Sequence, residues 1–294
     1  MKFSQSRFFD NHPVIYPWPE VLKETGFSKL YKPREVKFRE YFDLLALARG
    51  NTVLDVGCGD GILLERLRRT YAIAAAGVDI SPLSVKRAKE GCPEIKFLVA
   101  DATKLPFARD NFDAVLSFDT LEHIGGSGSA QGLADEQRKA IGEMIRVLKP
   151  GGRLLIYTIN KNQKFTLNWL LNGLGIDVYK GWAHDPKLFL DPKQVKRELE
   201  GGGVVVERIE LFNAFFTLMA DDVIMIASSG LAKLGLFEAN TKASLFLGKV
   251  FINLANLFSR NLLPVLAFLD TPWIKKGYSN SFFIIAGKTN YGSR

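Results

Sequence analysis

From residue 53 onward, short apolar runs alternate with amphipathic segments of helical periodicity. The apolar runs are typical of buried strands, and the amphipathic segments are typical of helices that cover a sheet. The predicted strands are 53–56, 75–80, 95–100, 112–118, 153–159, 204–211 and 281–287. The predicted helices are 62–70, 82–90, 135–148 and 192–201. Strands separated by helices over this many units indicate an α/β fold, with a parallel, helix-flanked sheet and right-handed crossovers.

Turn and cap signals set the ends of several elements. The helix at 135–148 is expected to stop at 149–152 (KPGG), a turn whose proline cannot continue a helix. The helix at 192–201 is expected to end in a glycine cap. Before the first strand, a Pro- and aromatic-rich lead-in is followed by a predicted helix at 33–49. Residues 1–50 are therefore expected to form an N-terminal helical cap.

Composition limits the class of protein. The 294 residues are 47% hydrophobic and 24% charged, a balance that allows a sizeable core. Two cysteines, Cys58 and Cys92, cannot make a disulfide framework, and the sequence has no Cys/His cluster with zinc spacing. The N-terminus lacks an apolar signal region, so a cytoplasmic protein is expected. The net charge of +8 allows an anionic partner, but without a Lys/Arg-rich run no nucleic acid is expected.

The stretch VLDVGCGDG (53–61) places glycines at alternate positions behind the first strand. A glycine-rich turn from strand to helix brings backbone N–H groups against a ligand, often a phosphate. The dinucleotide fingerprint needs G-x-G-x-x-G, however, and Ile62 stands where its third glycine is required. Asp55, just upstream, would repel a pyrophosphate and attract a cation. The plain alternative is a tight turn that packs a helix on a strand.

Acidic residues also stand at the ends of the next two strands. Asp79 lies at about the right distance to accept hydrogen bonds from both hydroxyls of a ribose, and Asp101 could accept from an exocyclic amine such as that of adenine. In an open α/β sheet, ligands bind beyond the carboxyl ends of the strands. Together with Asp55, these residues describe a site for a nucleoside that carries positive charge and no phosphate. S-adenosylmethionine (SAM) is such a molecule.

A second short motif does not carry a phosphate site. The tripeptide GKT (287–289) is similar to the end of a P-loop. Phe282 stands where the earlier glycine is required, and a predicted strand rather than a helix surrounds the motif. The P-loop interpretation is therefore discarded.

Five segments in order resemble the motifs of class I SAM-dependent methyltransferases. They are VLDVGCGDG, GVDIS (77–81), VADATKLPF (99–107), FDAVLSFDTLEHI (112–124) and IRVLKPGGRLLIYT (145–158). The branch with quinone-biosynthesis and small-molecule methyltransferases is the most similar, and the resemblance covers roughly residues 40–160. It implies a Rossmann-like seven-stranded sheet. The N-terminal helical cap and a helical insertion before the last strand are expected from this chain's own pattern, and the insertion departs from the family, whose last strand normally follows at once.

The resemblance also implies the cofactor contacts. The implied cofactor-binding residues are Asp55, Gly57, Cys58, Gly59, Gly61, Asp79, Ile80, Leu83, Asp101, Ala102, Ser117 and Phe118. Asp55 and the glycine loop would hold the methionine part, Asp79 the ribose, and Asp101 with the Ala102 backbone the adenine. Leu83 and Leu105 would flank the adenine ring. Ser117 and Phe118 would line the sulfonium side.

The implied organisation has four parts. They are an N-terminal helical cap at 1–50, a SAM-binding core at 51–211 with an acceptor lid at 160–192, an apolar helical insertion at 212–278, and the last strand and tail at 279–294. Trp169, Tyr179, Trp182 and His184 are the predicted acceptor-binding residues of the lid. The alternative is a surface loop that packs these aromatic residues on the core.

The segment DTLEH (119–123) follows the fourth strand and supplies the predicted catalytic residues, His123 and Glu122. A general base is needed only if the acceptor is protonated. His123 could instead be a packing residue at a helix start. A third interpretation is a divalent metal site, because some quinone and small-RNA methyltransferases carry E-x-x-E-H. Asp119, Glu122 and His123 resemble that pattern with a shorter acid in first place, and no metal is the main expectation. His184 could complete such a site only if its loop folds over the pocket.

About 65 residues separate the strands at 204–211 and 281–287, too many for a loop without structure of its own. Within them, 244–260 places apolar residues on one helical face opposite a polar stripe. No stretch reaches the ~18–20 uncharged apolar residues of a spanning helix, so no transmembrane segment is predicted. The helices either cover the sheet or another subunit, or form an apolar platform for a lipid-like acceptor or a bilayer surface. Trp273, Lys275 and Lys276 favour the platform.

The predicted function is SAM-dependent methyl transfer, by direct SN2 displacement, to oxygen or carbon of a small, largely apolar acceptor of quinone, polyketide or lipid type. The product of the cofactor would be S-adenosylhomocysteine. The expected partners are a small-molecule or lipid-linked acceptor and, at the periphery, an anionic membrane, with the chain a monomer or homodimer. The alternatives are an RNA or protein methyltransferase, a SAM-binding protein without catalysis, and a dehydrogenase.

Overall fold

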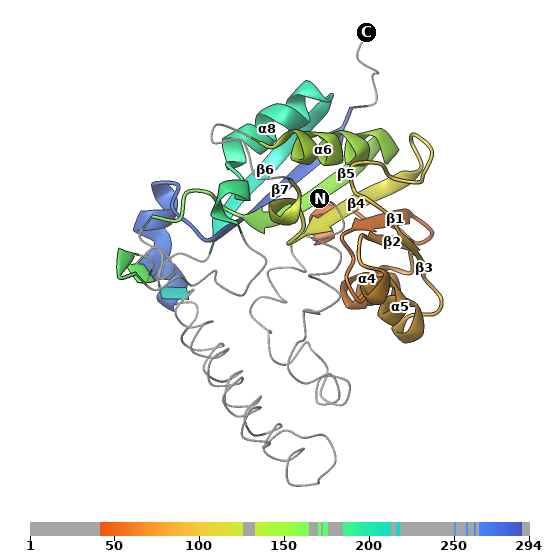
Figure 1. Cartoon of the computed structure of the whole chain (residues 1–294), viewed down its shortest axis with the longest axis horizontal. Helices are drawn as coiled ribbons and strands as arrows, with labels where there is room; N and C mark the ends of the chain where they lie inside the picture. The colour runs from red at the N-terminus through yellow and green to blue at the C-terminus, as the bar shows by residue number, and fades with distance from the viewer. Residues whose placement is uncertain are drawn as a thin grey trace.

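A computed structural model of the chain describes residues 42–125, 133–164, 170–171, 173–175, 185–212, 216–217, 250, 257, 262 and 265–289. They form a seven-stranded sheet with helices on both faces (Figure 1). The strands are β1 Thr52–Val56, β2 Ala74–Asp79, β3 Lys96–Val99, β4 Phe112–Phe118, β5 Leu148–Ile159, β6 Val204–Phe212 and β7 Ser281–Lys288. The helices are α4 Ile62–Tyr71, α5 Pro82–Gly91, α6 Asp135–Val147 and α8 Pro192–Gly201, with 3-10 turns η2 Leu121–His123 and η3 Pro186–Leu188. The predicted Rossmann-like α/β fold is confirmed.

Every strand and helix predicted for the core is present, and all but one begin and end within one residue of the predicted bounds. The exception is β5, which starts at Leu148 rather than at residue 153. Leu148 pairs with Phe112, and the ladder resumes where Arg153 lies opposite Ala114. The prediction of a turn at 149–152 is therefore wrong. Because Leu148 already pairs with Phe112, these residues belong to β5, and they form an irregularity in its pairing with β4.

The strand order is β3-β2-β1-β4-β5-β7-β6, and β7 runs antiparallel to both of its neighbours. The prediction of a parallel sheet is wrong for this strand alone. Ser281, at the start of β7, pairs with Phe212 at the end of β6 and with Ile159 at the end of β5. The chain therefore re-enters the sheet at the edge it left, and an antiparallel neighbour needs no crossover to the opposite edge.

Two helical layers enclose the sheet. In Figure 1, α6 and α8 cover one face, and α4 and α5 cover the other. The first core contains buried residues of α6, α8 and one side of the strands, among them Ile141, Met144, Val195, Leu199 and Phe282. The second contains Leu64, Leu67, Val85, Phe97 and Phe283. The central strands β4, β5 and β7 are buried on both sides, as expected inside an α/β sheet.

Helices α5 and α8 begin in the same way. The Ser81 hydroxyl accepts a hydrogen bond from the N–H of Ser84 at 3.0 Å, and a carboxylate oxygen of Asp191 accepts from the N–H of Lys193 at 2.8 Å. A proline follows each cap as the first helical residue. These caps satisfy otherwise unpaired N–H groups and explain why both predicted starts are correct.

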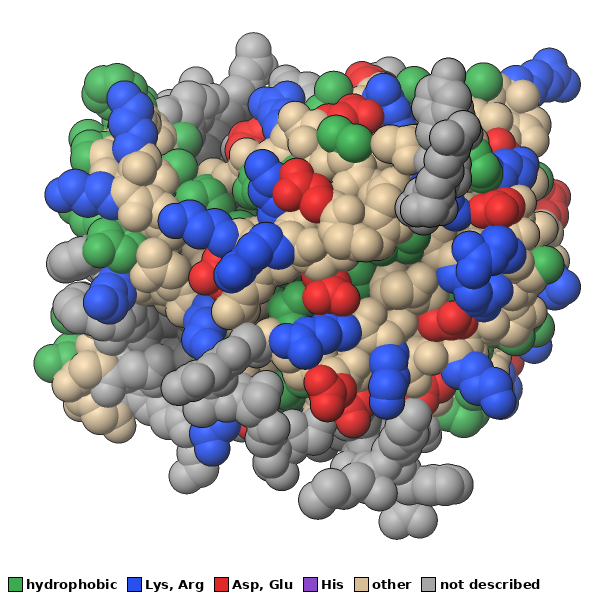
Figure 2. Space-filling model, turned by 90° about the horizontal axis from the view of Figure 1, so that it is seen from above, with side chains coloured by type: hydrophobic (Ala, Val, Ile, Leu, Met, Phe, Trp, Pro, Cys, Tyr) green, Lys and Arg blue, Asp and Glu red, His purple; other side chains and the backbone are tan. Residues whose placement is uncertain are grey.

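Basic and acidic side chains are interspersed over the layer of α6 and α8 (Figure 2). Arg138 lies 3.6 Å from Asp135 and 3.7 Å from Glu198, and Lys196 lies 3.6 Å from Glu200. Exposed pairs of this kind contribute little to stability. They do show that the positive charge of the chain is not gathered into one patch on this face.

The described end of the predicted N-terminal cap packs against the core. Phe42 and Leu45 are buried, and the Tyr71 hydroxyl donates to the Asp43 carboxylate at 2.7 Å. Arg153 in β5 donates to the carbonyl of Leu44. Residues 1–41 lie outside the described residues, so the rest of the predicted cap stays a prediction.

Most of the predicted insertion at 212–278 also lies outside the described residues, including nearly all of 244–260. A helix at 265–275 is described, and the turn that follows it contains Gly277, whose φ is +85°. Within the described parts of the chain, no helix is both long and apolar enough to cross a membrane.

Lys288, the lysine of the GKT tripeptide, has a structural role. Its ammonium group donates to the carbonyl oxygens of Ile145 at 2.9 Å and Leu148 at 2.6 Å, and lies 2.7 Å from the Asp110 carboxylate. These carbonyls belong to the end of α6, where a helix lacks internal donors and its dipole favours a cation. The lysine is therefore a cap that ties β7 to α6.

We expect Lys288→Met to lower the free energy of unfolding by about 2–3 kcal/mol, because hydrogen bonds to charged groups are lost and buried carbonyls are left unpaired. Lys89→Met is the matched control, since Lys89 lies exposed in the last turn of α5; its cost should stay under about 1 kcal/mol. Urea unfolding of both variants measures the difference, and equal losses would contradict the capping role.

Candidate functional site

The predicted cofactor residues meet at one edge of the sheet. In the strand order β3-β2-β1-β4, the neighbouring strands are parallel, so their carboxyl ends lie together. Asp55 pairs with Gly77 and Leu116, one residue before the end of β1, and Asp79 is the last residue of β2. The structure thus brings the acids and the glycine loop together, as the sequence predicts.

The glycine loop turns tightly against β2. The N–H groups of Gly57 and Cys58 both donate to the carbonyl of Val78, at 2.8 and 3.0 Å. A side chain on Gly57 would place its Cβ 2.1 Å from the Thr120 hydroxyl, and one on Gly61 would lie 2.5 Å from the Phe97 ring. Neighbouring protein atoms therefore already require glycine at these two positions.

Gly59 differs from the other two glycines. A Cβ there would meet no atom of the described residues within 4 Å, so within this part of the chain the middle of the loop faces open space. The N–H of Gly59 donates to one oxygen of Asp79 at 2.9 Å, and the N–H of Ser81 donates to the other at 2.8 Å. Asp79 thereby joins the loop to the start of α5, and each of its oxygens can accept a further hydrogen bond from a ligand hydroxyl.

Asp55 is the most unusual carboxyl group of the site. Its side chain is only 2% exposed, and among the described residues no donor reaches its Oδ1 atom. Burial, and after it the charge of Asp79, raises the pKa of Asp55 to about 7. A buried, incompletely paired carboxylate is costly unless a cation compensates it. The residues present therefore fit the cationic end of SAM.

Cys58 contributes backbone rather than chemistry. The side chain is buried, and burial together with the charge of Asp55 raises the pKa of its thiol. A thiol held neutral is a poor nucleophile. Its N–H donates to the Val78 carbonyl and so closes the loop, and its implied contact with the cofactor stays a prediction.

The segment that follows β3 is held by α6. Asp101 accepts from the N–H of Thr103 at 2.9 Å and from its hydroxyl at 2.7 Å. Glu143 accepts from the N–H of Leu105 at 2.7 Å, and Arg146 donates to the carbonyl of Leu105 at 3.1 Å. Arg146 also donates to the carbonyl of Phe107 at 2.9 Å. An ion pair on α6 thus positions the segment predicted to address the adenine.

Four other predicted contacts lie at or beside this segment and the end of β2. Ile80, Leu83 and Ala102 are partly exposed, as ligand-lining residues would be, whereas Leu105 is 4% exposed and belongs to the core. Leu105 is therefore placed as a packing residue, with only its backbone at the loop.

The end of β4 is more interior than predicted. Ser117 is fully buried, and no described residue donates to or accepts from its hydroxyl. Phe118 packs among aromatic rings, with centroid distances of 5.8 Å to Phe42, 5.7 Å to Tyr157 and 5.8 Å to Phe283. This aromatic cluster packs beneath the carboxyl end of β4, the neighbour of β1 in the sheet.

Glu122 points into the protein from η2. It is fully buried, its Oε2 accepts from the Thr158 hydroxyl at 2.7 Å, and within the described residues no donor reaches Oε1. Burial, followed by the charge of nearby Asp119, raises the pKa of Glu122. Asp119 itself is exposed and has a φ of +45°, and His123 is partly exposed.

The metal interpretation concerns Asp119, Glu122 and His123. Within the described residues, no group of three or more His, Cys, Asp or Glu side chains is placed to hold a metal ion. The Asp119 carboxyl is near enough to raise the pKa of Glu122, but Glu122 is buried against Thr158, and Asp119 is exposed. In the described part of the chain these three side chains are thus not arranged as one set of metal ligands.

Gln137 holds η2 in place, a role that the sequence analysis missed. Its amide donates to the carbonyls of Leu121 at 3.0 Å and Leu188 at 2.8 Å, and its oxygen accepts from the N–H of Ala134 at 2.9 Å. The available signal was a glutamine in the first turn of α6, which suggests a cap. Its bond to Leu188 could not be read from local pattern.

The predicted acceptor residues Trp169, Tyr179, Trp182 and His184 all lie outside the described residues. Of the predicted lid at 160–192, the structure describes 160–164, 170–171, 173–175 and 185–192. The lid and its four side chains remain predictions.

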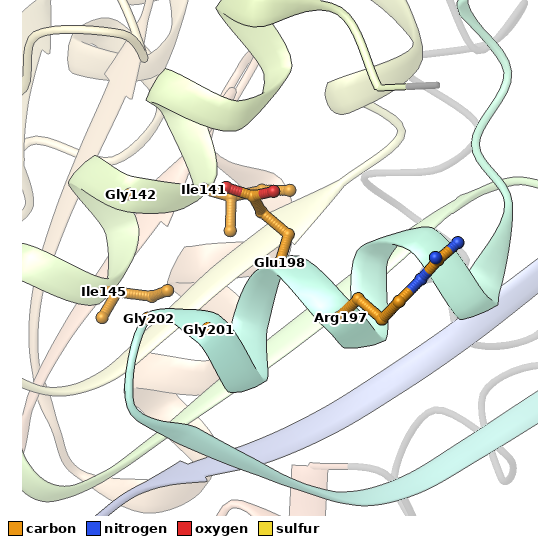
Figure 3. Close-up of a pocket in the computed structure, with 7 residues that line it drawn as sticks. All are labelled: Ile141, Gly142, Ile145, Arg197, Glu198, Gly201 and Gly202. Carbon is orange, nitrogen blue, oxygen red and sulfur yellow. The ribbon is translucent and has the colours of Figure 1, made fainter. Parts of the chain in front are cut away.

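A hollow of about 270 Å³ lies between α6 and α8 (Figure 3). Ile141 and Ile145 of α6 line it opposite Glu198 and Gly202 of α8. Both helices end here, before β5 and β6 begin, so the hollow lies toward the amino ends of the strands. It is on the opposite edge from the acids and the glycine loop, and it is not part of the cofactor site.

Comparison with known proteins agrees with this geometry. Residues 54–156 match the family described as a methyltransferase domain. The chain is 32% identical over 199 residues to a 2-methyl-6-phytyl-1,4-hydroquinone methyltransferase of Synechocystis sp., covering 66% of this chain and 58% of that protein. It is 33% identical over 193 residues to a ubiquinone biosynthesis O-methyltransferase of Aeromonas salmonicida, covering 62% and 75% of the two chains.

The fold is also shared with a solved structure. A geranyl diphosphate C-methyltransferase of Streptomyces coelicolor A3(2), solved with Mg²⁺, geranyl diphosphate and S-adenosylhomocysteine, superposes with a TM-score of 0.56. The superposition covers 87% of this chain and 79% of that one at 15% sequence identity. From its ordered motifs, its sheet and these relatives, the chain belongs to the class I SAM-dependent methyltransferase family.

Proposed function

We propose that this chain transfers the methyl group of SAM to an oxygen or carbon of a small, largely apolar acceptor of quinone, polyketide or lipid type. Binding of SAM is supported chiefly by the buried carboxyl of Asp55. It lies just before the glycine loop, and the charge of Asp79 acts on it. The acceptor class is supported by relatives named for a phytyl-hydroquinone and for ubiquinone biosynthesis, and by the neighbour solved with geranyl diphosphate. Two of these names describe compounds with long hydrocarbon groups.

In this proposal, the carboxyl-edge residues divide the cofactor between them. Asp55 and the loop from Gly57 to Gly61 hold the cationic methionine end, and Asp79 binds the ribose hydroxyls. Asp101 and Ala102 address the adenine, with their segment held by Arg146 of α6. SAM supplies a methyl group already activated by its sulfonium. The protein therefore has chiefly to align the acceptor and exclude water.

Glu122 is the stronger candidate for a general base. Its Oε1 is buried without a donor in the described structure, and burial, followed by the charge of Asp119, raises the pKa of its carboxyl, which makes the carboxylate a stronger base. The Thr120 side chain packs against Gly57, so this segment abuts the cofactor loop. His123, partly exposed on the same turn, is the second candidate.

The proposed reaction predicts acceptor-dependent formation of S-adenosylhomocysteine when the full chain is incubated with SAM and a phytyl- or prenyl-substituted hydroquinone. Mass spectrometry of the acceptor should show one added methyl group. SAM binding with no product from any prenylated hydroquinone or catechol, nor from any polyketide or lipid acceptor, would contradict the proposal and favour a SAM-binding protein without catalysis.

Within the same assay, Glu122→Gln should lower turnover by about 10²–10⁴-fold while leaving the affinity for SAM nearly unchanged, as expected for loss of a general base. His123→Asn is the matched comparison, since it lies one residue away on η2. Full turnover in the Glu122 variant would remove Glu122 from the reaction.

Replacing Asp79 with Asn should weaken SAM binding by about 1–3 kcal/mol, because charge-assisted hydrogen bonds to the ribose are lost. Isothermal titration calorimetry measures the change, and a melting curve checks that the bonds to Gly59 and Ser81 still hold the loop. Asp135→Asn, on the exposed start of α6, is the control and should bind SAM normally. An unaltered affinity in a folded Asp79 variant would refute the ribose assignment.

The raised pKa of Asp55 predicts that SAM binds more tightly as pH rises. Below a pKa of about 7 the carboxyl is protonated and cannot pair with a cation, so the dissociation constant should fall about tenfold between about pH 6 and about pH 8. The unliganded protein has the opposite trend, because the stability from protonated Asp55 is lost as pH rises from the unfolded value of 3.8 toward 7. The thermal shift caused by SAM should therefore grow with pH.

Asp55→Asn tests the source of this dependence. The variant should bind SAM more weakly and with a nearly flat profile over the same pH range. A wild-type profile that is already flat, or a variant profile that keeps its slope, would show that another group controls binding.

A further inference from the structure

The segment between β6 and β7 starts and ends at the carboxyl edge that carries the cofactor residues. Phe212 and Ser281 pair at this edge, beside Ile159 of β5. The helix at 265–275 is tied to the same place, because Asn162 donates to the carbonyl of Gly277 at 3.1 Å. Asn160 donates to the Ser279 hydroxyl at 2.9 Å. The helix is therefore anchored at the carboxyl edge of the sheet, the edge at which the proposed function places the cofactor.

One face of this helix is fixed against the protein. Asp270 is fully buried and accepts from the N–H of Phe216 at 2.8 Å and from the N–H and hydroxyl of Thr217 at 3.0 and 2.6 Å. The Trp273 ring lies 5.9 Å from the ring of Phe216. These contacts set which side of the helix faces inward.

The opposite face is apolar and exposed. Val265, Phe268, Leu269 and Pro272 have the spacing of one helical face, and the first three are 51%, 76% and 41% exposed. A helix that borders only water places polar residues there. Here the polar side chain, Asp270, lies inside and the apolar ones lie outside, which is the reverse of the usual arrangement.

A second exposed apolar segment lies on the same side of the molecule. Leu170 and Leu174, which follow β5, are 40% and 67% exposed. Figure 1 places this segment and the 265–275 helix on one side, and hydrophobic side chains gather along that edge in Figure 2. The surface is wider than a single helix.

The charge beside this face is positive. Lys275 and Lys276 are exposed at the end of the helix, and across 262–280 the one acidic residue is the buried Asp270. Apolar side chains flanked by lysines and by aromatic residues match the interface of an anionic bilayer. A second copy of the chain, with the same lysines, would bring like charges together.

We infer that the outward face of the 265–275 helix docks at the surface of an anionic lipid bilayer and holds the acceptor edge of the enzyme toward it. The acceptor would then enter from the lipid phase without leaving it. This inference rests on the proposed function for its acceptor class, but the binding surface can be tested without any acceptor.

The test measures flotation of the full chain with vesicles of phosphatidylcholine, with and without phosphatidylglycerol, at low and at high salt. We expect binding to the anionic vesicles that weakens as salt rises. The double variant Phe268→Glu with Leu269→Glu should bind at least about tenfold more weakly. Val205→Glu is the matched control, because Val205 is 54% exposed at the opposite edge of the sheet and should leave binding unchanged.

A second variant guards against misfolding. Lys275→Gln with Lys276→Gln leaves the apolar contacts in place and should weaken binding to anionic vesicles by about fivefold for each lysine removed. Both variants should keep the wild-type affinity for SAM. Binding that is absent in the wild type, or unaltered in both variants, would overturn the inference, as would a wild-type dimer that Phe268→Glu dissociates. Vesicle binding with no methyl transfer to any acceptor would instead reject the proposed function and leave the docking surface standing.

Discussion

A carboxyl group buried at the first turn of the sheet is the constraint on which the site depends. Moving the pKa of Asp55 from 3.8 to about 7 corresponds to a free-energy cost on the order of 4 kcal/mol at neutral pH. In the proposed function, a cationic ligand would remove that cost on binding. Asp55 would then favour a positively charged nucleoside over the phosphate-bearing ligands of related sheets.

The other residues at this edge hold the loop and helix next to Asp55 in place. Asp79 clamps the loop through Gly59 and the helix α5 through Ser81. After the end of β4, Thr120 packs directly against Gly57. This contact joins the glycine loop to the turn that contains Glu122. In the proposed function, the cofactor loop and the candidate general base therefore belong to segments that pack on each other.

The order and bounds of most strands and helices could be predicted from sequence. The apolar runs of the strands are short and separate, and helices such as α5 and α8 begin with clear capping residues. The placement of Asp55 and Asp79 at strand ends followed from the same pattern. The direction of β7 could not be predicted, since an apolar run such as SFFIIAG reads alike in both directions. The start of β5 was missed because pairing between Leu148 and Phe112 outweighs the local turn signal of Pro150.

The reasons for individual residues were harder to predict than their positions. Gly57 and Gly61 are glycines because of Thr120 and Phe97, which are distant in sequence, and only Gly59 faces open space. Gln137 and the Glu143–Arg146 pair act through backbone atoms of segments that the fold brings to them. Local patterns contain no information on such contacts.

The antiparallel last strand has a consequence for how such proteins diversify. Because β6 ends and β7 begins at one edge, the chain between Phe212 and Ser281 can change in length and character without moving any strand. Lys288 binds the last residues of β7 to the end of α6, and this contact does not depend on the segment between β6 and β7. Insertions between β6 and β7 can thus differ from one relative to another while the rest of the sheet is kept.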